Sequence, residues 1–129
     1  MDDEQLHKHL ASLEGRSQKR VGLVLAHLEA SGVDIPGLLT KRYAISRRWA
    51  DRALCVSECI RYAKTNDDAW RLGIDALGDR SRSVRRIACS LLAKARRPEA
   101  IGHLEKLLSD EELESDAQAA IAELERHSR

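Results

Sequence analysis

Apolar residues recur at the spacing of an α-helix along most of the chain, and this periodicity restricts the fold more than any other feature. Val21, Val24, Leu25 and Leu28 occupy the i, i+3, i+4 and i+7 positions that share one helix face. The pattern returns in further segments, which short polar, glycine or proline stretches separate. No stretch alternates β-branched or aromatic residues with polar ones, as a half-buried strand would. The sequence therefore predicts an all-α fold.

We expect about eight helices joined by turns of a few residues. Their starts are indicated by capping residues, prolines or first apolar positions: Asp2 or Asp3, Ser17, Asp34 with Pro36, Ser46, Asn66, Ser81 or Ser83, Pro98 and Leu113. Short turns favour antiparallel helical hairpins. At 129 residues the chain has the usual size of one domain, so we expect a single domain over residues 1–129.

Three details of this pattern can be compared with a structure. The first helix is expected to carry an apolar face and to end at Gly15; that face comprises Leu6, Leu10 and Leu13. The helix from Ser46 is expected to bury a continuous stripe made of Trp49, Ala53, Val56, Ile60 and Ala63. Gly78 is suited to the left-handed residue that commonly ends a helix.

A weak internal repeat relates residues 66–95 to residues 98–127. The matching pairs, with one residue inserted after the second pair, are Leu77 with Leu108, Asp79 with Asp110, Ala88 with Ala120, Cys89 with Ile121 and Leu92 with Leu124. The chain therefore uses one helical hairpin twice: a helix ending in Leu-x-Asp, a tight turn, then a helix with alanine at its closest approach.

This repeat resembles the HEAT repeat family, including the short bacterial HEAT-like repeats of the phycobilisome-lyase type. In that family an Asp ends the first helix, and a Val-Arg pair in the second helix precedes a buried Ala. The matching residues are Asp79, Val84, Arg85 and Ala88, whereas Asp116 and Ala117 replace the Val-Arg pair in the second copy. The resemblance implies a short α-solenoid, in which residues 1–65 form a degenerate helical half and residues 66–127 form two hairpins. It also implies a ladder between repeats through Asp79 and Arg85.

Charge is distributed unevenly along the chain, although the net charge is only +1. Residues 80–97 contain seven Lys or Arg and no acid, whereas residues 98–125 contain nine acids and the single base Lys106. Residues 41–52 contain five bases opposed only by Asp51. Local charge of this kind bears on partners rather than on the fold.

We predict a basic ridge of partner-binding residues formed by Arg48, Arg52, Arg85 and Arg86. In a HEAT-like stack the second helices of successive hairpins line one surface, which would bring these four side chains together. Cations near a helix start oppose the helix dipole. Either an acidic partner or the acidic last helix would neutralise them, and the sequence leaves both interpretations open.

No residue pattern points to catalysis, a metal or a cofactor. Cys55 and Cys59 lie four residues apart on one helix face, but a structural zinc site needs four ligands, and no second Cys or His pair is present. With Cys89 the thiols are an odd number within helix patterns, which favours free, reduced, buried cysteines in a reducing cytoplasm. The chain has no nucleophile elbow, phosphate-binding glycine loop or His-Glu-x-x-His motif.

Membrane insertion and export are not indicated either. The chain begins Met-Asp-Asp-Glu and continues into an amphipathic segment, unlike a signal peptide, and no stretch approaches the ~20 apolar residues of a membrane span. We therefore expect a cytoplasmic protein.

The expected function is non-catalytic protein binding through the surface of the second helices, with an acidic protein as partner. Bacterial immunity or antitoxin proteins that bind a toxin are the concrete case that fold-level analogy suggests. The alternative is a nucleic-acid-binding protein that uses the basic ridge, as the resemblance to HEAT-like alkylpurine DNA glycosylases implies. A bilin-lyase-like accessory role is a third hypothesis that the resemblance carries.

Overall fold

A computed structural model describes residues 4–5, 8 and 18–127 of the chain, and these residues are mostly helical with no strand among them. Seven α-helices are present in the described part: α2 (Gln18–Ala30), α3 (Ile35–Ile45), α4 (Trp49–Cys59), α5 (Asp67–Ala76), α6 (Arg82–Ala95), α7 (Ile101–Glu105) and α8 (Glu114–His127). Two 3-10 turns, η1 (Ile60–Tyr62) and η2 (Pro98–Ala100), follow α4 and precede α7. The all-α prediction is confirmed, with seven helices described rather than about eight. The remaining expected helix, with Leu6, Leu10, Leu13 and Gly15, lies outside the described residues.

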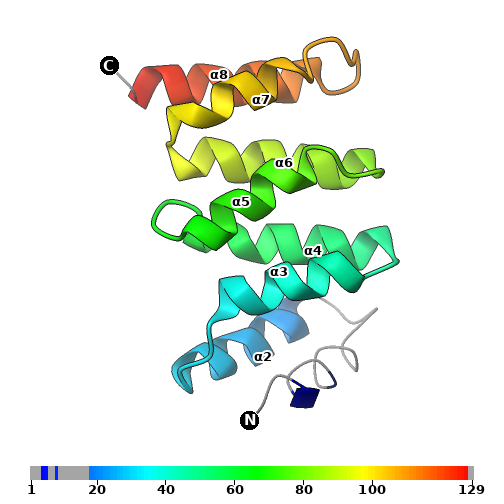
Figure 1. The fold of residues 1–129 in the computed structure, drawn as a ribbon, viewed down its shortest axis with the longest axis vertical. Helices are drawn as coiled ribbons and strands as arrows, with labels where there is room; N and C mark the ends of the chain where they lie inside the picture. Colours follow the sequence, from blue (N-terminus) through cyan, green and yellow to red (C-terminus); the bar gives the residue numbers. More distant parts are fainter. Residues whose placement is uncertain (1–3, 6–7, 9–17, 128–129) are drawn as a thin grey trace.

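The helices form a two-layered stack of antiparallel hairpins (Figure 1). Helices α3, α5 and α7 lie in front in this view, and each packs on the helix that follows it, α4, α6 or α8. Within the second layer α4 contacts α6 and α6 contacts α8, so these three helices run parallel and side by side. Helix α2 packs against α3 at the opposite end of the stack from α8.

An aliphatic core runs through the stack from α2 to α8. Its fully buried large side chains include Leu25, Leu72, Val84, Leu91 and Leu104. Burying a side chain of this kind stabilises the fold by roughly 1.5–3 kcal/mol. Helices α5 and α6 approach closely at Gly73, where a Cβ atom would stand 2.4 Å from Cδ2 of Leu91.

Two of the expected helix caps are present. The Asp34 carboxylate accepts a hydrogen bond of 3.2 Å from the Gly37 N–H at the start of α3. The Asn66 side chain accepts one of 3.0 Å from the Ala69 N–H at the start of α5. Each cap satisfies a backbone donor that the first turn of a helix leaves free.

The expected start of the fourth helix is wrong. Ser46 ends α3, and its hydroxyl donates a hydrogen bond of 2.6 Å to the Arg42 carbonyl. Helix α4 begins only at Trp49, which is 55% exposed. The expected stripe is therefore buried at Ala53, Val56 and Ala63 but not at its first member, because the first residue of α4 extends beyond the packing face.

The turn between α5 and α6 also differs from the prediction. Successive 3-10-type bonds end α5, and Gly78 does not adopt the left-handed conformation. Among the described residues, that conformation occurs at Gly32 (φ 89°) and Arg96 (φ 56°). Ser81 precedes α6 as expected, but its side chain makes no capping bond.

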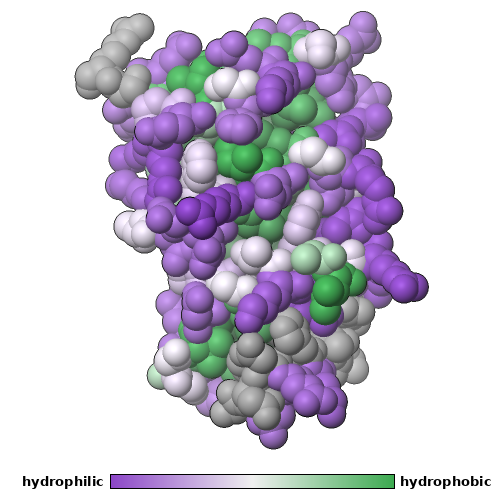
Figure 2. Space-filling model, in the orientation of Figure 1, coloured by the Kyte–Doolittle hydropathy of each residue, from purple (hydrophilic) through white to green (hydrophobic). Residues whose placement is uncertain are grey.

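The face formed by α3, α5 and α7 is largely polar (Figure 2). Apolar atoms reach this surface in small groups between polar side chains, as is normal for a solvated face. Of the large apolar residues described, only Leu23, Ile45 and Trp49 are more than half exposed. No helix in the described part of the chain is long and apolar enough to span a bilayer.

Candidate binding surface

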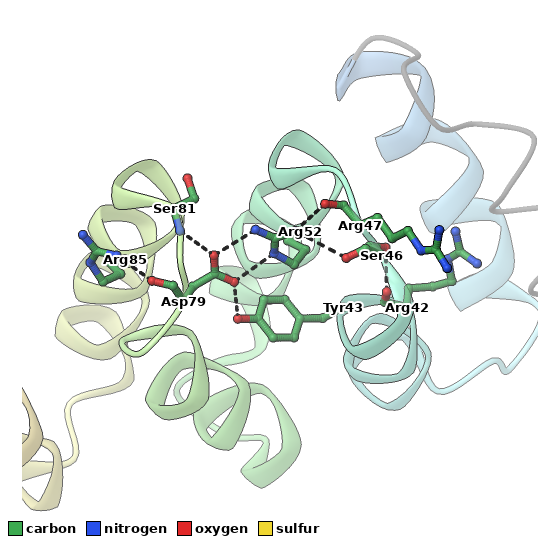
Figure 3. Close-up of polar contacts among 8 residues, drawn as sticks. All are labelled: Arg42, Tyr43, Ser46, Arg47, Arg52, Asp79, Ser81 and Arg85. Atoms are coloured by element: carbon green, nitrogen blue, oxygen red, sulfur yellow. Dashed lines mark hydrogen bonds and ion pairs between the residues drawn. The ribbon is translucent and has the colours of Figure 1, made fainter.

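A buried ion pair fixes the turn between α5 and α6 to the preceding hairpin (Figure 3). The Arg52 guanidinium donates two hydrogen bonds to the Asp79 carboxylate, from Nε to Oδ2 at 3.0 Å and from Nη2 to Oδ1 at 3.1 Å. The Tyr43 hydroxyl donates to Oδ2 at 2.5 Å, and the Ser81 N–H donates to Oδ1 at 2.9 Å. The side chains of Arg52 and Asp79 are only 8% and 4% exposed, so solvent hardly screens the pair.

The hydrogen bonds keep this pair ionised. Burial alone would raise the pKa of Asp79, but the bonds from Arg52, Tyr43 and the Ser81 N–H outweigh it and hold that pKa below its ordinary value. The hydrogen bond to Asp79 raises the pKa of Arg52, and burial raises the pKa of the Tyr43 hydroxyl, with Asp79 adding to the effect. Both oxygens of the Asp79 carboxylate are hydrogen-bonded within the fold, so this network holds neighbouring elements together.

A looser and more exposed version of this arrangement recurs one hairpin further along. Arg85 donates a hydrogen bond of 2.6 Å to the Asp79 carbonyl, and its Nη2 lies 3.8 Å from Oδ2 of Asp110. Oδ1 of Asp110 accepts from the Glu112 N–H at 3.0 Å, as Oδ1 of Asp79 accepts from the Ser81 N–H. The carboxylate of Asp79 therefore pairs with Arg52 of the preceding hairpin, not with Arg85, which pairs forward with Asp110.

The structure places the four predicted ridge residues in separate ion pairs. Arg52 is buried on Asp79, and the Arg85 side chain is 21% exposed. Arg86 and Arg48 are more than half exposed, and their Nε atoms lie 3.2 Å from Asp116 Oδ2 and 3.7 Å from Asp51 Oδ2. Arg82 and Arg97 pair in the same way with Glu112 and Asp67. Acids of other elements thus pair with Arg82, Arg85, Arg86 and Arg97 of the basic run, and Arg52 is buried.

An open groove of about 750 Å³ lies over α6, and we call it the α6 groove. Short side chains of α6 form its floor: Cys89, Ser90 and Ala93. Residues of η1 and the following turn line one side, namely Ile60, Arg61 and Lys64, and a stripe of α8 lines the other, namely Asp116, Ala119, Ala120 and Glu123. Lys94 and Arg96 project from the end of α6. Because Ser90 and Ala93 lie nearly opposite the Leu91–Leu92 side that packs on α5, the groove faces away from α5.

Positive charge without a direct ion pair collects in this groove. The side chains of Lys64, Lys94 and Arg96 are exposed and make no hydrogen bond or ion pair in the described part of the chain. Arg61 lies 3.7 Å from Glu29, with both side chains largely exposed. On the α8 side, Glu123 is hydrogen-bonded to His127, which lowers the pKa of that carboxyl and keeps it charged. Although it makes no ion pair, Arg96 lies near enough to Glu123 to help lower that pKa.

Arg96, which lines the groove, has a strained backbone conformation. It is the C-cap of α6, with φ 56° and ψ 33° in the left-handed region. A residue with a Cβ adopts this conformation at a cost of roughly 1–2 kcal/mol, and glycine usually occupies such a position. Strain of this kind is often retained at functional sites.

The groove offers binding rather than an activated nucleophile. Burial, aided by Asp116, raises the pKa of Cys89 to about 11, so the thiol stays protonated. Ser90 has no hydrogen-bonded base among the described residues. Cys55 and Cys59 are buried thiols that form no disulfide and lie outside the groove, and burial raises the pKa of Cys59 to about 12. No three His, Cys, Asp or Glu of the described ranges are grouped to hold a metal ion.

The sequence contained a signal for this groove that the ridge hypothesis did not use. Ser90, Ala93 and Ala119 are small residues on helix surfaces next to Lys94 and Arg96, at the end of the basic run. The ridge hypothesis emphasised the start of that helix, where the structure pairs the arginines with acids.

Comparison with known proteins identifies no relative: no family model matches the chain, and no curated protein or solved structure is similar enough to count as a match.

Proposed function

We propose that this chain is a non-catalytic binding module that holds an acidic segment of a partner protein in the α6 groove. The observation that carries the proposal is a cluster of exposed cations that make no direct ion pair, Lys64, Lys94 and Arg96, beside a floor of short side chains. The arginines near the helix starts already make ion pairs with acids, whereas Arg96 interacts with Glu123 without forming such a pair. Arg48 and Arg86 remain exposed on the same helix layer and are proposed as peripheral contacts.

We further propose that the stack is a short HEAT-like solenoid. Support comes from the spacing of equivalent contacts: Arg52 and Arg85 are 33 residues apart, and the Asp79 and Asp110 carboxylates that they reach are 31 apart. Stacked repeats present extended surfaces suited to binding other proteins. A toxin bound by an immunity-type protein is one partner consistent with this proposal.

A protein partner suits the groove better than nucleic acid does. Asp116 and Glu123 line the same groove, and a protein segment can place a basic side chain against these acids, whereas a phosphate backbone carries negative charge throughout. None of the lining residues is aromatic, so the groove has no platform on which bases could stack.

Site-specific photo-crosslinking in cells tests the proposal. A photoreactive residue at Ala119, which is exposed and lines the groove, should give a discrete protein adduct. Ala122 is the matched control, because it is exposed on the same helix but does not line the groove. The double variant Lys94→Glu/Arg96→Glu should abolish the Ala119 adduct.

Arg71→Glu/Arg80→Glu controls for net charge, since both residues are exposed cations outside the groove lining. This variant should retain the Ala119 adduct. An adduct that consists of nucleic acid, or one that forms equally from Ala122, would reject the proposed function.

A further inference from the structure

We propose that the occupant of the α6 groove is an amphipathic α-helix lying along α6. This inference rests on the proposed function and specifies the conformation and charge pattern of the partner. An acidic edge of the occupant faces Lys64, Lys94 and Arg96, small apolar side chains face the floor, and a basic side chain faces Glu123.

The shape of the groove favours a helix. The lining of α6 runs from Cys89 to Arg96, and that of α8 runs from Asp116 to Glu123. Each stretch covers seven helical rises, or about 10 Å, which is about two turns of an added helix. The short side chains at Ser90, Ala93 and Ala119 allow a third helix axis to approach closely.

The chemistry of the floor argues against an extended segment. A strand would bring unpaired backbone N–H and C=O groups to the floor of Cys89, Ser90 and Ala93, where the Ser90 hydroxyl is the one strong hydrogen-bonding side chain. Unpaired backbone groups are costly when they lose contact with water. A helix satisfies these groups internally, so only its side chains need complementary contacts.

The net positive charge of the groove favours a helix of another protein over a second copy of this chain as the occupant. The groove is lined by four bases, Arg61, Lys64, Lys94 and Arg96, and by two acids, Asp116 and Glu123, a difference of +2. A second copy docked groove to groove would place +2 against +2. An acidic helix with one basic edge would complement both sides, and this complementarity also fixes its rotation about its own axis.

The test uses three fluorescein-labelled, alanine-based peptides, measured by fluorescence anisotropy. In the first, Glu residues form one helical edge and Lys residues form the other. The second has the same composition, with the charges distributed around the helix. The third keeps the charge order of the first but contains a central Pro-Pro pair that breaks the helix. Circular dichroism verifies the helicity of the peptides and the fold of each protein variant.

The first peptide should bind the wild-type protein about tenfold more tightly than either of the others. Lys94→Glu/Arg96→Glu should weaken its binding about tenfold, whereas Arg71→Glu/Arg80→Glu should change it less than about twofold. Equal binding of all three peptides, or no binding of the first up to about 1 mM, would overturn the inference.

Light scattering after gel filtration adds an independent outcome. A wild-type dimer that Lys94→Glu/Arg96→Glu converts to a monomer would identify a second copy as the occupant, against the inference. If the Ala119 crosslink captures a protein while the patterned peptide fails, the proposed function stands and the helical occupant is rejected. If both fail, both proposals are rejected.

Discussion

Asp79 connects three elements of the stack through one side chain. Its carboxylate is bonded to Tyr43 of α3, to Arg52 of α4 and to the Ser81 N–H that precedes α6. Arg52 also donates a hydrogen bond of 2.8 Å to the Arg47 carbonyl, so its guanidinium is engaged inside the fold and does not act as a surface cation. Removing one partner of such a buried pair leaves the other charge without compensation.

Asp79→Ala should therefore lower the free energy of unfolding by about 3–5 kcal/mol, measured by urea denaturation. The control is Glu112→Ala, which removes the partner of Arg82 in an ion pair whose two side chains are about half exposed. That change should cost less than about 1 kcal/mol, because solvent screens the pair. Similar costs for the two variants would show that the buried pair has no special structural role.

The same carboxylate should make stability depend on acidic pH. The folded-state pKa of Asp79 lies below the ordinary value of 3.8, so its stabilisation is complete above that value and is lost as pH falls through the folded pKa. Asp79→Asn removes this titration. The stability difference between the wild type and Asp79→Asn should shrink between about pH 5 and about pH 2 in urea titrations. A difference that stays constant over this range would contradict the lowered pKa.

The left-handed backbone at Arg96 predicts a conflict between stability and binding. Arg96→Gly relieves the conformational cost and should be more stable than Arg96→Ala, which retains it, by about 1 kcal/mol in thermal or urea unfolding. Both variants remove the charge and should bind the partner more weakly than the wild type. Equal stability of the glycine and alanine variants would show that the conformation is unstrained.

At the scale of elements, local signals predict the helices well and their pairing poorly. The i, i+3, i+4, i+7 spacing in α2 and the caps at Asp34 and Asn66 depend on neighbours in sequence, and the structure confirms them. The exposure of Trp49 and the partner of Asp79 depend on which helix packs alongside. Sequence spacing does not specify such contacts.

In the candidate site, too, some features can be predicted from the sequence and others depend on which helices pack together. The density of bases around the turn between α3 and α4 and on α6 was visible in the sequence, but which bases stay without an ion pair depends on the acids that the stack brings near them. Asp110 and Asp116 follow Arg85 and Arg86 by 25 and 30 residues, and the fold places them within ion-pair distance. On α6 and its C-cap, Lys94 and Arg96 lie outside these ion pairs and remain exposed in the groove, together with Lys64.

The packing of α4 on α6 also predicts how the chain responds to cleavage. A fragment beginning after Asn66 retains α5 to α8 but exposes the face of α6 that α4 covers. The fully buried Val56 and Cys59 belong to the part that is lost. The fragment should unfold at lower temperature than the whole chain, followed by circular dichroism. Equal stability would mean that the two halves have independent cores, against the expected single domain.

At the scale of the whole molecule, the ion pairs that link the helices of the second layer lie apart from the exposed bases Lys64, Lys94 and Arg96. Ion pairs join successive hairpins near the starts of α4, α6 and α8, where Arg52, Arg85 and Arg86 lie. Bases without a direct ion pair gather towards the opposite ends of α4 and α6, at Lys64, Lys94 and Arg96. The first end of the second layer thus links successive hairpins, and the proposed binding surface lies at the other end, where Arg97 pairs with Asp67.

The most direct test of this account uses the partner protein identified by the crosslink from position 119. Titration calorimetry measures the affinity of that partner for two variants of this chain that have equal net charge. Lys94→Glu/Arg96→Glu should weaken binding by about tenfold or more, and Arg71→Glu/Arg80→Glu should leave it within about twofold of the wild type. Equal loss in both variants would mean that binding follows net charge. Unchanged affinity in the first variant would show that the α6 groove is not the binding surface.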